Sequence, residues 1–352
     1  MKANIAIDCR MIYSSGIGTY IQSILPNVIN QINNSNFYLI VNFKIDNFFD
    51  NINIVYIEVK AKPYSIREQF EIRKKLPKNL SLYWSPHYIN PFFLNTKYLL
   101  TIHDMYHLNK TNNFWKRLYA YFYFSHIKFY NYNLIAVSNF TKNELLKFGF
   151  NSKSINMIYN GVSSSYKNLR LERKKIILSV GNLKKNKNIS RLVDAFEFIQ
   201  NDIDLDLYIV GEYNNIRDKD YIAMNKIKLN KRIHLLGVLD QVELEKFYNY
   251  ASFYIQPSTY EGFGYPPLEA MSCACPVLSS KEGSLKEICK YGALYFDAYD
   301  YKDIASKMKY FIKSKSLKDE LINNGKRVIL DYNLTTTINK TINLIERKIK
   351  WK

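Results

Sequence analysis

Short apolar runs alternate with amphipathic stretches along most of the chain. In the first half, the apolar runs predict strands at residues 4–9, 37–43, 53–58, 82–84, 98–103 and 134–137. The pattern restarts in the second half, at residues 176–180, 205–210, 233–236, 253–256, 277–279 and 293–296. Segments with helical periodicity lie between several of these runs, for example residues 17–32, 140–148, 189–199, 242–250 and 303–313. Alternation of this kind predicts an α/β fold, in which helices cover both faces of parallel sheets.

The two series of predicted strands indicate two domains. A chain of 352 residues is longer than one ordinary hydrophobic core supports. Residues 163–170 are polar and Ser-rich and precede a charged run, so they are the best candidate linker. We expect one doubly wound domain over residues 1–165, another over residues 171–330, and a C-terminal segment over residues 331–352. Ligands bind beyond the carboxyl ends of strands in such sheets, which predicts a cleft between the domains.

The chain has a formal net charge of +19, and its N-terminal half is the more basic one. Residues 1–170 hold 20 Lys and Arg against 8 Asp and Glu, whereas residues 171–352 hold 30 against 23. A basic surface favours polyanionic partners. The sequence shows no zinc finger, basic zipper or RNP motif, so we expect no nucleic-acid partner. An anionic membrane surface or a lipid-linked diphosphate is the better partner class.

The four cysteines, Cys9, Cys273, Cys275 and Cys289, form no pattern typical of a secreted, disulfide-bonded protein. No second Cys or His cluster completes a metal site with Cys273 and Cys275, so we expect small buried side chains there. The first ten residues are typical of a strand and lack the long apolar region of a signal peptide. No run of about 18 apolar residues predicts a membrane span. We therefore expect a cytoplasmic protein.

Two carboxylates, Glu261 and Glu269, flank a Gly-rich turn that leads into a helix started by proline. Backbone amides of residues 262–265, together with that of Leu268, are suited to a diphosphate at a helix N-terminus. The two prolines suit the first helical turn but have no N–H group to donate. Because carboxylates hydrogen-bond sugar hydroxyls, this layout predicts a grip on a sugar nucleotide, with Glu269 near the ribose. The simpler alternative is an ordinary helix N-terminus with a favourable acidic residue.

Three further segments come directly after predicted strands, where ligand sites tend to form. Gly16 and Gly18 open a helix and let the backbone approach a phosphate, or they form a tight turn. They do not complete G-x-G-x-x-G, because position 21 is Ile, so a nicotinamide cofactor gains little support. His103 is suited to a sugar hydroxyl, although a lone histidine is more often structural. Lysines within residues 184–187 either neutralise a departing diphosphate or form a solvated basic loop.

Two other patterns have competing interpretations. Asp202, Asp204 and Asp206 resemble a metal-binding D-x-D, but alternation at the edge of a predicted strand is the simpler explanation. Residues 114–124 are aromatic and basic, as in a segment that contacts a membrane surface. The same residues are also typical of a core helix of the first domain.

Taken together, these motifs resemble a retaining glycosyltransferase of family 4 with the GT-B fold. The resemblance runs along most of the chain and culminates in residues 257–271, which contain the E-x7-E element of the family. It implies two Rossmann-like doubly wound domains facing a central cleft, the first binding the acceptor and the second the nucleotide sugar. As in similar proteins, the C-terminal helix would pack back on the first domain. The other matching segments are Gly16 and Gly18 and residues 102–104, 136–141, 158–162, 180–181, 187–188, 209–211 and 236–238.

The resemblance also implies roles for individual residues. Glu261 would contact hydroxyls of the donor hexose, His103 would lie at the reacting face, and Lys187 would neutralise the departing diphosphate. Asn182 and Asn186 stand where family members often carry Arg, so Lys184 or Lys185 substitutes or the diphosphate grip is weaker. Contacts to the diphosphate, the ribose and the base would come from Gly16, Gly18, Lys185, Val238, Phe263, Gly264, Tyr265, Leu268 and Glu269.

The expected reaction transfers a hexose, with mannose favoured, from GDP-mannose or another nucleoside diphosphate hexose and retains the anomeric configuration. No side chain is an evident nucleophile, so a front-face route is preferred, and lysine and amide groups leave no need for a metal ion. The implied acceptor is lipid-linked or saccharide, in O-antigen, capsule or similar surface-polysaccharide synthesis, with possible peripheral association at the inner membrane. Alternatives are a non-catalytic nucleotide-sugar-binding subunit and a nucleotide-sugar epimerase.

Overall fold

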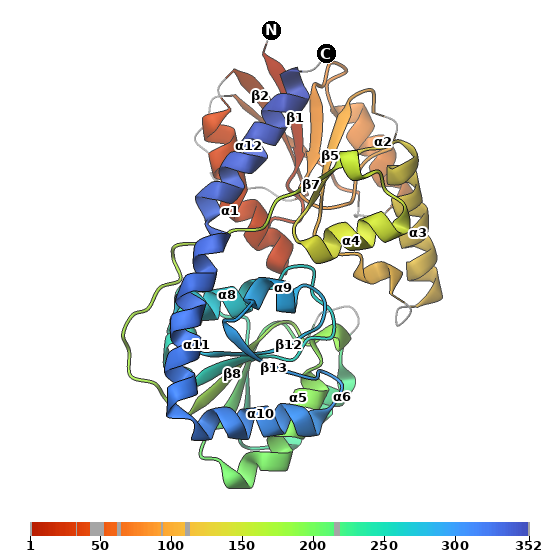
Figure 1. Ribbon diagram of the computed structural model, residues 1–352. Helices are drawn as coiled ribbons and strands as arrows, with labels where there is room; N and C mark the ends of the chain where they lie inside the picture. The colour runs from red at the N-terminus through yellow and green to blue at the C-terminus, as the bar shows by residue number, and fades with distance from the viewer. Residues whose placement is uncertain are drawn as a thin grey trace. The chain divides into compact units, whose positions relative to one another are not determined.

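The computed structural model describes residues 2–32, 34–42, 53–61, 65–92, 94–109, 113–214 and 219–350. The chain divides into two compact units (Figure 1). Unit 1 comprises Met1–Gly161 and Leu334–Lys352, and unit 2 comprises Val162–Asn333. Each unit is built on a parallel sheet, so the predicted α/β class with two doubly wound sheets is confirmed.

Within the described residues, unit 1 contains a seven-stranded parallel sheet in the order β3-β2-β1-β4-β5-β6-β7. The direction of the strand order reverses between β1 and β4. In doubly wound sheets such a reversal leaves a crevice at the carboxyl ends of the two strands. The strands are β1 (Ala3–Asp8), β2 (Ser35–Val41), β3 (Ile54–Glu58), β4 (Leu82–Ser85), β5 (Lys97–Ile102), β6 (Asn133–Ala136) and β7 (Ile155–Met157).

Helices cover both faces of the unit 1 sheet, because side chains alternate along each strand. Ile5 and Ile7 of β1 join one hydrophobic cluster with α1 and α12, whereas Ala6 joins another with α2, α3 and α4. The helices of this unit are α1 (Ser15–Gln31), α2 (Ile66–Lys75), α3 (Phe114–Phe129), α4 (Asn139–Phe148) and α12 (Leu334–Lys350), with 3-10 turns at Tyr106–Leu108 and Ser152–Ser154.

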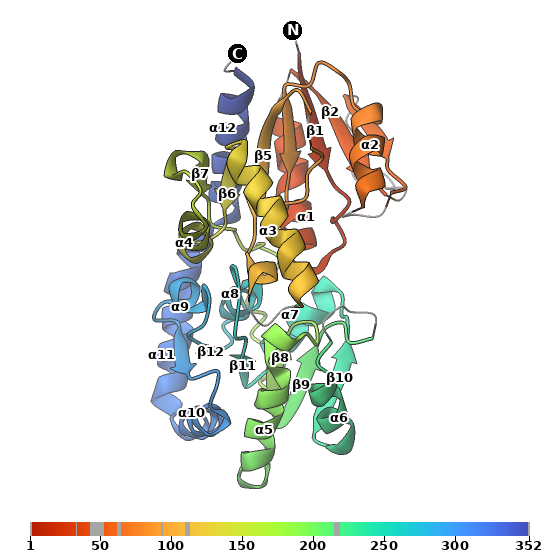
Figure 2. The ribbon, with the colours of Figure 1, turned by 90° about the vertical axis from the view of Figure 1, so that its right-hand side faces the viewer.

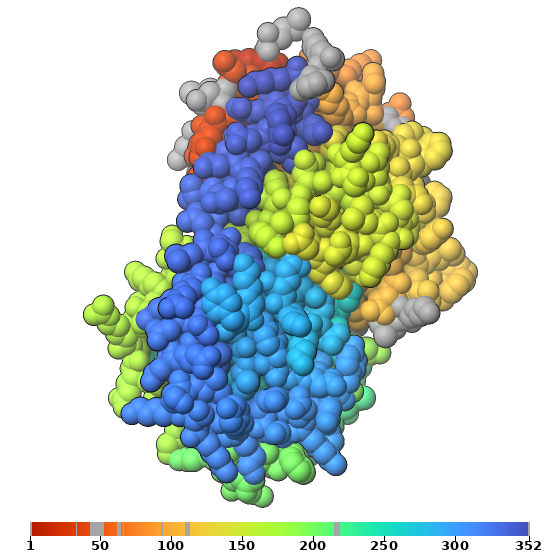
Figure 3. Space-filling model, viewed as in Figure 1, coloured from red at the N-terminus to blue at the C-terminus, as the bar shows by residue number. Residues whose placement is uncertain are grey.

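The C-terminal helix α12 belongs to unit 1, although it follows unit 2 in the sequence. Its Ile338 and Ile342 lie in the same buried cluster as Leu25 of α1. Thr337 donates from Oγ1 to the main-chain oxygen of Tyr159 at 2.8 Å. The space-filling view shows α12 as a blue band beside the red and orange N-terminal segments of this unit (Figure 3). The last helix therefore completes the core of unit 1.

Unit 2 contains a six-stranded parallel sheet in the order β10-β9-β8-β11-β12-β13, counted over the residues that the structure describes. Its strand order reverses between β8 and β11, as that of unit 1 does between β1 and β4. Three strands, β8 (Ile176–Val180), β11 (Phe253–Gln256) and β13 (Ala293–Phe296), have the bounds expected from the apolar runs. The others are β9 (Asp206–Val210), β10 (Ile233–Gly237) and β12 (Val277–Ser280).

Helices also flank the unit 2 sheet on both sides (Figure 2). In α5 the buried residues Ile189, Leu192, Val193 and Phe196 recur at helical spacing, which explains why this segment forms a helix against the sheet. The helices are α5 (Ile189–Ile199), α6 (Tyr221–Leu229), α7 (Gln241–Tyr250), α8 (Tyr265–Ser272), α9 (Leu285–Cys289), α10 (Tyr301–Lys313) and α11 (Lys315–Val328), with 3-10 turns at Lys185–Lys187, Gln200–Asp202 and Ile329–Tyr332.

The structure differs from the sequence expectation in a few places. Strand β7 was not predicted, because it is only three residues long. The polar residues 163–170 lie inside unit 2, where the Lys167 amide donates to Glu245 Oε1 (3.1 Å) and the Leu169 amide to Asn249 Oδ1 (2.8 Å). The chain passes from unit 1 to unit 2 before this segment, between residues 161 and 162. Residue 43, the expected end of the second strand, is outside the described residues.

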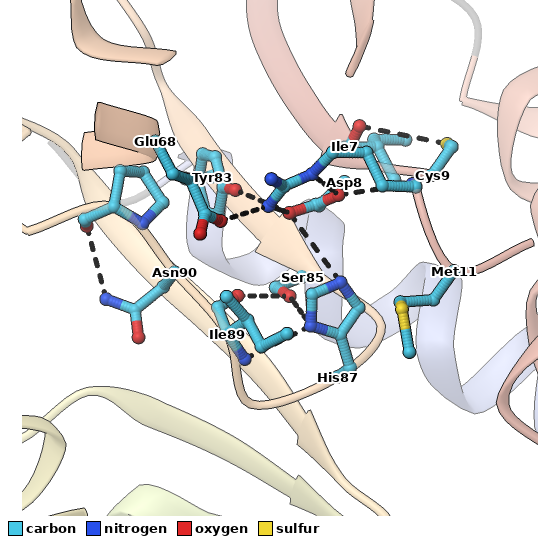
Figure 4. A network of polar contacts seen from close by, with 12 residues as sticks. Ile7, Asp8, Cys9, Met11, Glu68, Tyr83, Ser85, His87, Ile89 and Asn90 are labelled. Atoms are coloured by element: carbon cyan, nitrogen blue, oxygen red, sulfur yellow. Dashed lines mark hydrogen bonds and ion pairs between the residues drawn. The ribbon is translucent and has the colours of Figure 1, made fainter. Parts of the chain in front are cut away.

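The carboxyl ends of β1 and β4 carry a buried network of charged side chains (Figure 4). Arg10 donates from Nε to Asp8 Oδ1 (2.9 Å) and from Nη2 to Glu68 Oε1 (2.6 Å). Tyr83 donates to Asp8 Oδ2 (3.2 Å), and His87 Nε2 lies 3.6 Å from the same oxygen. Burial alone would raise the pKa of Asp8, but Arg10 and His87 hold it well below its usual range. The network thus ties β1, β4 and α2 together.

Replacing Asp8 with Asn should lower the free energy of unfolding of unit 1 by about 3–5 kcal/mol, because buried Arg10 would keep a single carboxylate partner. Urea denaturation followed by tryptophan fluorescence measures this change, since Trp84 and Trp115 both lie in unit 1. The control is Lys75→Gln, which breaks the exposed Lys75–Glu71 pair and should cost less than about 1 kcal/mol. Equal stability of the two variants would contradict the prediction.

Candidate functional site

The loops that follow β8 and β11 meet where the strand order of unit 2 reverses. Lys187 follows β8 and Glu261 follows β11, and Lys187 Nζ lies 2.6 Å from Glu261 Oε1. The two side chains are mostly buried, with exposed fractions of 20% and 12%. The structure therefore brings together two of the three predicted catalytic residues, which are 74 positions apart in the sequence.

Three polar residues that the sequence reasoning did not single out also hold Glu261. Gln256, the last residue of β11, donates from Nε2 to Glu261 Oε1 at 2.9 Å, and Ser258 donates from Oγ to the same oxygen at 2.7 Å. Ser284 donates from its amide (3.0 Å) and its Oγ (3.1 Å) to the main-chain oxygen of Glu261. A usable sequence signal for Gln256 and Ser258 is their place at the strand end directly before the motif.

Two asparagines link the loop that contains Lys187 to the loop that contains Glu261 through hydrogen bonds. The amide of Thr259 donates to the main-chain oxygen of Asn186 (2.8 Å), and Asn186 Nδ2 donates to that of Tyr260 (3.2 Å). Asn188 Nδ2 donates to the main-chain oxygen of Pro257 (2.9 Å). Asn186 occupies a position where members of the family that this sequence resembles often have Arg. Here its amide holds the two loops in register.

Gly264 ends the turn of the motif and precedes α8, which begins at Tyr265. Gly264 has a φ of +98°, and a Cβ there would lie 2.9 Å from Leu285 Cδ2, so this position requires glycine. The second and third residues of α8, Pro266 and Pro267, have no N–H groups, and the fourth, Leu268, is where intrahelical hydrogen bonding begins. Any contact between backbone amides and a phosphate therefore falls mainly to residues 262–265.

The other predicted donor-binding residues of unit 2 differ in exposure. Phe263 is buried, and its ring packs against that of Tyr332 with centroids 5.8 Å apart, so only its backbone is suited to a ligand. Lys185 is exposed in the 3-10 turn that carries Lys187. Val238 follows β10 and is 69% exposed. Lys185 and Val238 thus lie beyond the carboxyl ends of strands, as a ligand site of this fold requires.

Glu269 is buried on α8, in contrast to the partly exposed Glu261. Tyr248 donates from its hydroxyl to Glu269 Oε2 at 2.8 Å. Burial raises the pKa of Glu269 to about 7, and the hydrogen bond from Tyr248 offsets only part of that rise. The carboxyl group of Glu269 therefore titrates near neutral pH.

The predicted residues of unit 1 follow β1 and β5. Gly16 is exposed in the first turn of α1, whereas Gly18 is buried, and a Cβ on Gly18 would lie 2.5 Å from the main-chain oxygen of Ile12. Close packing alone therefore accounts for glycine at position 18. His103 Nε2 lies 2.9 Å from the main-chain oxygen of Pro86.

His103 has a defined tautomer because of that contact. A carbonyl oxygen only accepts, so Nε2 carries the proton and Nδ1 is the acceptor of the neutral ring. Burial lowers the pKa of His103 to about 4, so the ring is neutral at pH 7. His103 is therefore suited to accept a hydrogen bond from a hydroxyl group.

The three aspartates of the D-x-D pattern contact different partners. Asp202 pairs with Lys309, Asp204 with Lys175, and Asp206 with both Arg232 (3.0 Å) and His234 (2.9 Å). Each carboxylate has a cationic partner of its own, as expected for charges along the edge of a strand.

The four cysteines are buried free thiols.

Helix α3, which covers residues 114–124, presents two different faces. Ala120, Tyr123, Phe124 and Ile127 are buried against the sheet, so the segment is a core helix. Its opposite face consists of exposed apolar side chains, and its sequence contains Lys116, Arg117 and Lys128 but no acidic residue. None of the helices within the described residues is long and apolar enough to cross a membrane. We call the exposed face the aromatic surface of α3; it comprises Trp115, Leu118, Tyr119, Phe122 and Phe129.

Solved structures with the same fold include a glycosyltransferase. A glycosyltransferase from Rickettsia africae superimposes with a TM-score of 0.76 over 100% of both chains, at 18% identity. Anabaena Alr3699/HepE, solved in complex with UDP-glucose, gives a TM-score of 0.78 over 98% of this chain and 99% of that chain, at 15% identity. These likenesses define the class of fold as GT-B.

Two family models cover most of the chain. Residues 61–166 match the model described as glycosyltransferase family 4, and residues 164–328 match the model described as glycosyl transferases group 1. These two matches, over residues 61–328, support the resemblance to glycosyltransferase family 4, and the E-x7-E element lies within the second match.

Some curated relatives have stated roles. The O-antigen chain mannosyltransferase RfbU of Salmonella typhimurium is 26% identical over 232 residues, which are 66% of this chain and 65% of the relative. The chain spans about 60–65% of the length of the first curated relatives that it matches.

Replacing Glu269 with Gln should make the free energy of unfolding less sensitive to rising pH. Because the folded state holds the proton of Glu269 up to about pH 7 while the unfolded state releases it near 4.5, wild-type stability falls between these values. The free energy of unfolding of Glu269→Gln relative to wild type should therefore rise by about 3 kcal/mol from pH 4.5 to pH 8. Urea denaturation at several pH values measures this difference. A flat difference, like that of the exposed control Glu320→Gln, would contradict the pKa assignment.

Proposed function

We propose that this protein transfers a hexose, with mannose favoured, from a nucleoside diphosphate sugar to a lipid-linked or saccharide acceptor in the synthesis of a cell-surface polysaccharide. The observation that carries the proposal is the contact of Lys187 with Glu261 at the strand-order reversal of unit 2. A cation and a carboxylate side by side match the two ends of a sugar nucleotide, namely its diphosphate and its sugar hydroxyls. RfbU, a mannosyltransferase of O-antigen chains, supports the choice of sugar and pathway.

In the proposed site, Glu261 accepts hydrogen bonds from hydroxyls of the hexose, and Glu269 binds the ribose. Lys187 and the amides of residues 262–265 stabilise the charge that develops on the departing diphosphate. These groups supply positive charge without a metal ion, so the proposed reaction requires none. The neutral Nδ1 of His103 accepts a hydrogen bond from a substrate hydroxyl.

The proposed stereochemistry is retention. Such a transfer passes through an oxocarbenium-like state, with the leaving phosphate accepting the proton of the acceptor hydroxyl. Among the described residues, the carboxylate suited to the hexose is Glu261, and Lys187, Gln256 and Ser258 already contact its Oε1. This contact set favours a binding role for Glu261 over that of a covalent nucleophile.

Replacing Glu261 with Ala should reduce hexose transfer and donor hydrolysis by at least about a hundredfold, because both the sugar contact and the partner of Lys187 are lost. Thermal stabilisation by GDP-, UDP- and TDP-sugars first identifies the donor, and turnover is then measured with and without EDTA. Glu320→Gln, an exposed acidic residue on α11, is the control.

Near-normal turnover of Glu261→Ala would reject the assignment of this residue. Loss of wild-type turnover in EDTA would reject metal independence. A wild-type protein that binds a sugar nucleotide but neither hydrolyses nor transfers the sugar would instead be a non-catalytic binding subunit.

We further propose that the aromatic surface of α3 rests on an anionic membrane, where a lipid-linked acceptor resides. Trp115 and Phe122 are 72% and 64% exposed, although large apolar side chains are normally buried. Aromatic side chains flanked by Lys and Arg are typical of helices that lie in the membrane interface. The excess of basic residues in residues 1–170 complements anionic lipids.

The double variant Trp115→Ser/Phe122→Ser should weaken binding to vesicles that contain phosphatidylglycerol by more than about tenfold, because two large apolar side chains no longer enter the interface. Flotation with and without salt, and with pure phosphatidylcholine, measures binding. The matched control removes two exposed aromatics of unit 2, Tyr291→Ser/Tyr310→Ser. If wild-type protein fails to float with anionic vesicles at any salt concentration, the membrane proposal is wrong.

A further inference from the structure

The carboxylate of Glu261 is held through one oxygen only. Lys187 Nζ (2.6 Å), Ser258 Oγ (2.7 Å) and Gln256 Nε2 (2.9 Å) all donate to Oε1. None of the described residues donates a hydrogen bond to Oε2. Some polar side-chain atoms are fully buried and lack a hydrogen-bond partner, but Oε2 is not one of them. A carboxylate oxygen has two lone-pair sites, so Oε1 is saturated while Oε2 keeps its full accepting capacity.

The donors to Oε1 are themselves oriented by a buried chain of hydrogen bonds. A carboxylate only accepts, so the amide nitrogen of Gln256 must face Glu261, and its amide oxygen then faces the hydroxyl of Tyr254, which donates to it. Gln256 Nε2 also donates to Ser258 Oγ (2.6 Å), which leaves the Ser258 proton for Glu261. The donor and the acceptor are therefore fixed for every hydrogen bond in this series.

Burial separates these residues from any substrate. Tyr254 and Ser258 are fully buried and Gln256 is 2% exposed. They lie on β11 and in the loop directly after it, behind the carboxylate that they contact. Their hydrogen bonds are therefore available to Glu261 but not to a ligand.

We propose that Gln256 and Ser258 are positioning residues that present Oε2 of Glu261 to the hydroxyls of the donor sugar. This inference rests on the proposed function, because it assumes that Glu261 meets the sugar. The saturated Oε1 fixes the rotation of the carboxylate, and Lys187 supplies the counter-charge. A carboxylate that rotated freely would lose the hydrogen-bond geometry on which sugar orientation depends.

Ser258→Ala and Gln256→Met should each lower turnover with the donor selected in the GDP-, UDP- and TDP-sugar screen by about tenfold to a hundredfold, because each removes a hydrogen bond to a charged group. Affinity for the matching nucleoside diphosphate, which has no sugar, should stay within about twofold of wild type. Ser279→Ala removes another buried serine, one without a contact to Glu261, and should leave both quantities within about twofold.

A double-mutant cycle separates positioning from a general structural effect. In the Glu261→Gln background, Ser258→Ala should change turnover by less than about twofold, because its partner is already altered. The inference is overturned if Ser258→Ala and Gln256→Met keep wild-type turnover, if their losses persist in the Glu261→Gln background, or if nucleoside diphosphate affinity falls in parallel. In each of these cases the wild-type enzyme stays active. A wild-type protein that binds no sugar nucleotide overturns the proposed function and this inference with it.

Discussion

The strand order of unit 2 is the constraint on which the candidate site depends. Because β8 and β11 are neighbours in a parallel sheet, their carboxyl ends and the loops that follow them lie side by side. Lys187 and Glu261 come from these two loops and meet at 2.6 Å. The hydrogen bonds of Asn186 and Asn188 to the Glu261 loop then hold the two loops in register. An ion pair between residues so distant in sequence follows from topology.

The same reversal in unit 1 carries a different kind of charge cluster. Asp8, Arg10 and Glu68 are buried and bind one another, so their charges are used within the protein. A buried ion network of this sort is costly to break. In unit 2, by contrast, one oxygen of Glu261 stays accessible. Two equivalent positions of the same topology thus hold a buried ion network in unit 1 and a partly exposed ion pair in unit 2.

Much of the fold was predictable from the sequence, and part of the site was not. Apolar runs located the strands closely because a buried parallel strand is a short, continuous apolar segment, and β8, β11 and β13 even have the expected bounds. Glu261 and Lys187 were identified from local motifs. The role of Asn186 depends on which loops become neighbours, and local patterns do not encode strand order. The sequence of helix α3 allowed two interpretations because both faces of the helix carry apolar side chains. Only the packing shows which face is buried and which is exposed.

The two glutamates of the motif are not equivalent, although they are eight residues apart on one turn and helix. Glu261 lies beside a lysine and two neutral donors, all on one oxygen. Glu269 is enclosed on α8, and burial moves its pKa to about 7. One motif thus places one carboxylate beside a cation in a loop and encloses the other on a helix, so closeness in sequence does not give the two glutamates the same environment.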